Sequence, residues 1–103
     1  MEFDRIKTDI KNVGFDMARI DKDDYLEIVI RKVSLEGLLR VLEGIFGPSK
    51  NRVSKEMETL IKDYGGLRKG QTLFFLNNNG AYLFAMIWPW SDDERITIKV
   101  GTS

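Results

Sequence analysis

The stretch QTLFFLNNNGAYLFAMIWPWSDDERITIKV, residues 71–100, decides the fold of this chain. The polar segments Asn77-Asn78-Asn79-Gly80 and Ser91-Asp92-Asp93-Glu94 divide it into three apolar runs. Asn-Gly between apolar runs is the strongest short-range signal for a β-hairpin. We therefore predict an antiparallel β-meander. Its strands are expected at 71–77, 81–90 and 95–100.

The register of the first hairpin divides the apolar side chains between two faces. A two-residue loop at 79–80 pairs Leu76 with Leu83 and Phe75 with Phe84, and paired residues point to the same side of a sheet. The first face then carries Phe74, Leu76, Leu83, Ala85 and Ile87. The second face carries Leu73, Phe75, Tyr82, Phe84, Met86 and Trp88.

The second hairpin indicates which face the helices cover. A loop at 91–94 pairs Ile98 with Ile87 and Thr97 with Trp88. The last strand is then apolar on the first face and polar on the second. We expect helices on the first face and an outward-facing second face.

The first two-thirds of the chain supplies helices and one more hairpin. Apolar residues at steps of three and four predict three helices. Their expected ranges are 3–13, 35–46 and 52–64. Two strands, at 15–20 and 25–33, flank the turn Asp21-Lys22-Asp23-Asp24. Pairing across this turn sets Met17 opposite Ile28 and Phe15 opposite Ile30.

The element order α-β-β-α-α-β-β-β predicts an α+β fold. We expect a two-layer sandwich in one domain, residues 1–103, with a mainly antiparallel sheet of about five strands. A short connection between the second and third helices predicts a helical hairpin, which would pack on one face of the sheet.

Composition restricts the chemistry. The chain has no cysteine and no histidine, which excludes thiolate metal sites, a cysteine nucleophile and the usual general base. We predict no catalytic residue, metal or cofactor. The 16 basic side chains balance the 16 acidic ones, so no net charge attracts nucleic acid. A charged N-terminus and the lack of a long apolar run favour a cytoplasmic protein without membrane segments.

Two sequence patterns resemble known binding loops without matching them. Residues 65–72 approach a phosphate-binding loop, but Gln71 replaces the lysine, and a helix precedes where one should follow. Asp21-Lys22-Asp23-Asp24 resembles a calcium loop, but Leu26 stands where the turn glycine is needed. We expect structural turns at both places.

An outward second face would leave six large apolar side chains in water. Burying one such side chain contributes about 1.5–3 kcal/mol, so exposed patches of this size usually mark binding surfaces. The predicted contact residues are Leu73, Phe75, Tyr82, Phe84, Met86 and Trp88. In the alternative arrangement, the N-terminal helix crosses over and covers this face within the same chain.

The functional hypothesis is a small non-enzymatic interaction module. It would form a homodimer through the second face or bind another protein there. Three alternatives remain open: a small-ligand-binding protein, an enzyme using only carboxylates and lysines, and an inhibitor-like protein that blocks a partner.

Overall fold

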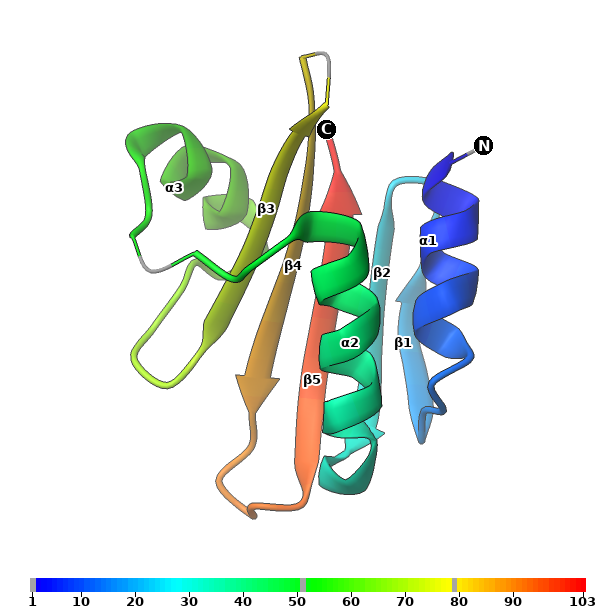
Figure 1. Cartoon of the computed structure of the whole chain (residues 1–103). Helices are drawn as coiled ribbons and strands as arrows, with labels where there is room; N and C mark the ends of the chain where they lie inside the picture. Colours follow the sequence, from blue (N-terminus) through cyan, green and yellow to red (C-terminus); the bar gives the residue numbers. More distant parts are fainter. Residues whose placement is uncertain (1, 51, 79) are drawn as a thin grey trace.

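The sheet has the spatial order β1-β2-β5-β4-β3, and every neighbouring pair is antiparallel (Figure 1). The computed structural model describes residues 2–50, 52–78 and 80–103, and the five strands are counted over these. They span Met17–Asp21 (β1), Tyr25–Arg31 (β2), Thr72–Asn78 (β3), Ala81–Pro89 (β4) and Arg95–Thr102 (β5). The predicted α+β class and antiparallel sheet are confirmed.

Both predicted registers of the C-terminal meander are confirmed. Leu76 pairs with Leu83 between β3 and β4, and Ile87 pairs with Ile98 between β4 and β5. Asn79, in the first turn, lies outside the described residues. Since these pairings hold, the division of the meander into two faces also holds.

The N-terminal hairpin differs from the prediction. Met17 pairs with Val29 and not with Ile28, because Asp21, which was expected in the turn, pairs with Leu26, and the register then shifts by one residue between Ala18 and Ile20. A shift of one residue moves a side chain to the opposite face of the sheet. Met17 therefore lies on the second face, away from the helices that cover the first.

The first face is covered by α1 (Glu2–Lys11) and α2 (Leu35–Phe46), which lie side by side across the sheet (Figure 1). A short 3₁₀ turn, η1 (Lys32–Ser34), leads from β2 into α2. The two helices and the sheet share one buried apolar core. The helical contributors are Phe3, Ile6, Ile10, Leu38, Leu42 and Phe46.

The predicted helical hairpin on one face is wrong. α3 (Lys55–Ile61) and the following 3₁₀ turn η2 (Lys62–Tyr64) pack on the second face, opposite α2. After α2 the chain reaches the edge of β3, where the Lys50 amide donates to the Leu73 carbonyl at 2.8 Å. Because both faces are apolar, each needs a cover, and α1 takes the place beside α2 that α3 was expected to fill.

Candidate functional site

The second face is not the open surface that was predicted. Leu73, Phe75, Phe84 and Met86 are buried in the chain's own core, and Tyr82 and Trp88 are half-buried. The cover is α3 with η2, and the alternative cover, α1, lies on the opposite face. The six predicted contact residues are therefore brought together, but chiefly as a second hydrophobic core.

Aromatic stacking fixes η2 to the second face. The Tyr64 ring lies 4.7 Å from the Tyr25 ring and 4.8 Å from the Phe84 ring, measured between centroids. The Phe84 ring passes over Gly101, where a Cβ atom would come within 2.6 Å of it. These contacts leave no room for a ligand between the sheet and η2.

Lys99 is the titratable group whose surroundings most resemble those of a catalytic amine. Its Nζ lies 3.3 Å from the centroid of the Trp88 ring and donates to the Tyr64 carbonyl at 2.7 Å. Burial lowers the pKa of Lys99, as it does in catalytic lysines. Here the amine is held between an aromatic ring and a carbonyl, which is a structural role.

β1 lies at one edge of the sheet and is largely open to solvent. Of its residues, only Ile20 is partly covered, and the other four are exposed. An edge strand presents backbone N–H and C=O groups with no partner strand, so it can pair with another chain. The irregularity between Ala18 and Ile20 interrupts the register of β1, and such a bulge hinders pairing of an edge strand with another chain.

Exposed apolar side chains gather where β1 begins. Among the described residues, four large hydrophobic side chains are exposed, and three of them are Phe15 (43%), Met17 (54%) and Val33 (87%). The fourth, Val53, precedes α3. We refer to Phe15, Met17 and Val33 as the end patch.

Backbone and ion-pair contacts hold the two segments of the end patch together. The Asp16 amide donates to the Val29 carbonyl at 2.8 Å, and the Asp16 carboxylate lies 3.0 Å from Arg31 Nε. A Cβ at Gly14 would lie 4.0 Å from the Ser34 hydroxyl oxygen. The chain before β1 therefore runs beside η1.

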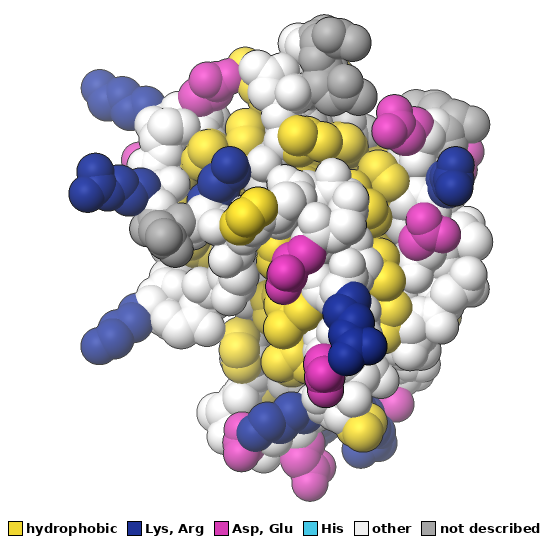
Figure 2. Space-filling view, in the orientation of Figure 1, with side chains coloured by type: hydrophobic (Ala, Val, Ile, Leu, Met, Phe, Trp, Pro, Cys, Tyr) yellow, Lys and Arg dark blue, Asp and Glu magenta, His cyan; other side chains and the backbone are white. Residues whose placement is uncertain are grey.

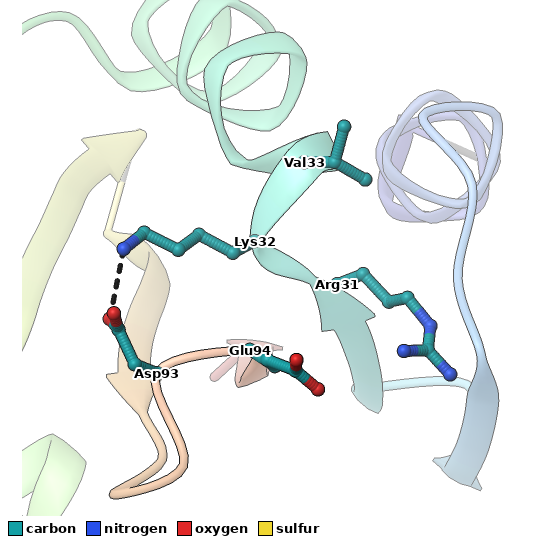
Figure 3. A pocket seen from close by; sticks show the side chains of 5 residues that line it. All are labelled: Arg31, Lys32, Val33, Asp93 and Glu94. Atoms are coloured by element: carbon teal, nitrogen blue, oxygen red, sulfur yellow. Dashed lines mark hydrogen bonds and ion pairs between the residues drawn. The ribbon is translucent and has the colours of Figure 1, made fainter.

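A shallow hollow of about 470 Å³ adjoins the end patch (Figure 3). It is lined by Arg31, Lys32, Val33, Asp93 and Glu94. Lys32 Nζ bonds the Asp93 carboxylate at 2.9 Å, while Val33 points away from this pair (Figure 3). Two cations and two anions leave the hollow without net charge. Such a lining suits the polar rim of an interface.

The other end of β1 is tied to α1. Lys11 and Lys7 both bond the Asp21 carboxylate, and these hydrogen bonds lower the pKa of Asp21. Lys7 also donates to the Lys22 carbonyl at 2.7 Å. The second half of β1 is thus held to α1 through Asp21. Among the described residues, no such ion pair joins α1 to the first half of β1, which carries the end patch.

Sequence reasoning missed the end patch. Met17 was expected to face the helices, and only the register shift in β1 turns it outward. Val33 was expected to continue a strand, but β2 ends at Arg31. The one available signal was that Val33 lies two residues before the predicted helix at 35–46, where a connection must begin.

Comparison with protein-family models, with curated proteins and with solved structures found no match. Within the described part of the chain, no helix is long and apolar enough to cross a membrane. The same residues contain no group of three or more acidic side chains placed to hold a metal ion.

Proposed function

We propose that this protein is a non-enzymatic interaction module that self-associates through the first half of β1 and the end patch. The observation that carries the proposal is the coincidence of an open sheet edge with three of the four large apolar side chains that are exposed among the described residues. This surface replaces the second face as the proposed contact surface, because the second face is covered by the chain's own α3 and η2.

The open edge of β1 would set the orientation of the partner strand, and burial of the end patch would supply most of the binding free energy. Unpaired backbone groups on β1 favour a partner strand, and an antiparallel one continues the pattern of the sheet. Fully burying a side chain of the size of Phe15 or Met17 contributes about 1.5–3 kcal/mol. A contact limited to one half-strand and three side chains is small, so we expect a weak dimer.

A second copy of the chain fits this surface. The net charge is zero, so two copies do not repel each other as a whole. A two-fold axis beside Met17 would set the Met17 side chains of the two copies opposite each other.

The test is the mass in solution as a function of concentration. Sedimentation equilibrium should show the 11.9 kDa chain when dilute and a species of twice that mass when concentrated. Met17→Glu should abolish the heavier species, because its pairing would bury two like charges. Val53→Glu, at the exposed apolar residue outside the end patch, should associate like the wild type.

Two outcomes would refute self-association at this surface. The first is a wild-type chain that stays monomeric at every concentration. The second is a dimer that survives Met17→Glu.

A further inference from the structure

A crevice opens between α1 and α2 at the opposite end of the sheet from the end patch. Its volume is about 320 Å³. Four aliphatic side chains line it: Ile6 of α1, Ile45 of α2, Leu76 of β3 and Leu83 of β4. Hydrophobic side chains are visible along both sides of α2 on this face of the molecule (Figure 2).

Gly44 lines the crevice and leaves space there that a larger side chain would occupy. It lies inside α2, where glycine costs about 0.8–1.0 kcal/mol relative to alanine. A Cβ at Gly44 would meet no atom within 4 Å, whereas a Cβ at Gly37 would lie 3.6 Å from Val13. The segment that follows α1 therefore contacts α2 near Gly37, whereas no atom lies as close to Gly44. Neither close packing nor a positive φ requires glycine at position 44.

The rim of the crevice is charged and comes from one helix. Glu2, Arg5 and Asp9 of α1 line it, so two carboxylates stand against one guanidinium. An aliphatic interior with an acidic rim complements a molecule that has an apolar chain and a cationic head. The volume is at the lower end of the range of about 300–1,000 Å³ found for small-ligand sites.

We propose that this crevice binds a small amphipathic cation, with its chain against Leu76 and Leu83 and its ammonium group near Glu2 and Asp9. The site goes beyond self-association. It shares no residue with the end patch, so each proposal stands or fails without the other.

The probe is octylammonium, titrated below its micelle concentration into methyl-labelled protein. We expect saturable NMR shifts at the methyl groups of Ile6, Ile45, Leu76 and Leu83. Octanoate, which has the same chain length and the opposite charge, should bind at least about tenfold more weakly, a difference of about 1.4 kcal/mol. Shifts that do not saturate, or octanoate that binds equally well, would overturn the proposal.

Two pairs of variants locate the site. Gly44→Leu fills the crevice and should weaken octylammonium binding by about tenfold or more, since the chain loses its apolar contacts. Arg40→Leu adds the same side chain on the exposed side of α2 and should leave the affinity unchanged.

The second pair tests the rim and does not depend on whether Gly44→Leu folds. Glu2→Gln combined with Asp9→Asn should also weaken binding, while Glu36→Gln, on α2, should not. Wild-type affinity in Gly44→Leu, or in the double variant, would contradict the assignment.

Discussion

Tyr25 lies on the covered second face and is buried from solvent there. Its hydroxyl donates to Glu27 Oε1 at 2.7 Å, and its ring stacks on Tyr64. Burial, followed by the hydrogen bond to Glu27, raises the pKa of Tyr25 above its ordinary value of 10.0. In the unfolded chain this phenol ionises near pH 10, but in the folded chain it stays protonated.

This difference makes the free energy of unfolding fall as pH rises above 10. Below pH 10 both states hold the proton, so the contribution of Tyr25 is fully present there. Above pH 10 only the unfolded state releases it, which favours unfolding. Denaturant titrations at increasing pH should therefore show a smaller loss of stability in Tyr25→Phe than in the wild type. Equal losses would mean that the Tyr25 hydroxyl is open to water.

Asp92 provides the acid counterpart in the turn between β4 and β5. Its carboxylate accepts from the Glu94 amide, the Arg95 amide and the Arg95 guanidinium, at 3.0, 3.0 and 2.7 Å. These bonds, led by the one from the Glu94 amide, lower the pKa of Asp92 from 3.8 to about 2. NMR titration of its carboxyl carbon should give this value.

The sign of the pH effect of Asp92 is opposite to that of Tyr25. Because the folded pKa is lowered, its stabilising contribution is present above pH 3.8 and is lost as pH falls through about 2. Asp92→Asn should remove this part of the acid dependence. Asp9→Asn, which removes a charge elsewhere, should retain it.

At the scale of elements, the junction between η2 and β3 depends on Gly65. This residue has a φ of +101°, and a Cβ there would lie 2.4 Å from Trp88 Cη2. Gly66 has a φ of +70° with no atom within 4 Å of such a Cβ. A side chain at either position would therefore strain the left-handed backbone, but only a side chain at Gly65 would also clash with Trp88.

Alanine substitutions at Gly65 and Gly66 separate these two effects. Gly66→Ala should cost about 1–2 kcal/mol, for the left-handed backbone alone. Gly65→Ala should cost about 1–3 kcal/mol more, since the Trp88 ring must shift against Lys99. Chemical denaturation of both variants measures the difference. Equal costs would show that Trp88 moves freely.

The elements that sequence predicted best are those specified by neighbours in the chain. The meander follows from alternating apolar residues and two short turns, so both of its registers were predictable. Its second strand ends at Pro89, a residue that cannot donate a hydrogen bond to the sheet. The register shift in β1 has no such local pattern, and the outward position of Met17 depends on it.

The position of α3 shows the limit of the same reasoning at the scale of the whole molecule. Its apolar stripe fits either face of the sheet, and a short connection to α2 favoured the first. The outcome depends on how much surface each face leaves to cover, and on the contact of Lys50 with the edge of β3. Both are properties of the complete fold. The exposed second face was therefore mispredicted, although each residue on it was assigned correctly.

The whole molecule thus has two hydrophobic cores that share one sheet. The first core lies under α1 and α2, and the second lies under α3 and η2. Ile61 is the buried residue of α3 in the second core, with 1% of its surface exposed. If that core contributes to global stability, truncating Ile61 must destabilise the entire chain.

Ile61→Ala should lower the free energy of unfolding by about 2–5 kcal/mol, as large-to-small changes in cores do. Lys62→Ala, at the exposed next position, should stay within about 0.5 kcal/mol of the wild type. Ile61→Asp should go further and release α3 from the sheet, because it buries an unpaired charge. The uncovered Phe84 and Met86 should then bind a hydrophobic dye and cause aggregation. A soluble Ile61→Asp variant without dye binding would mean that the second face does not need α3 as its cover.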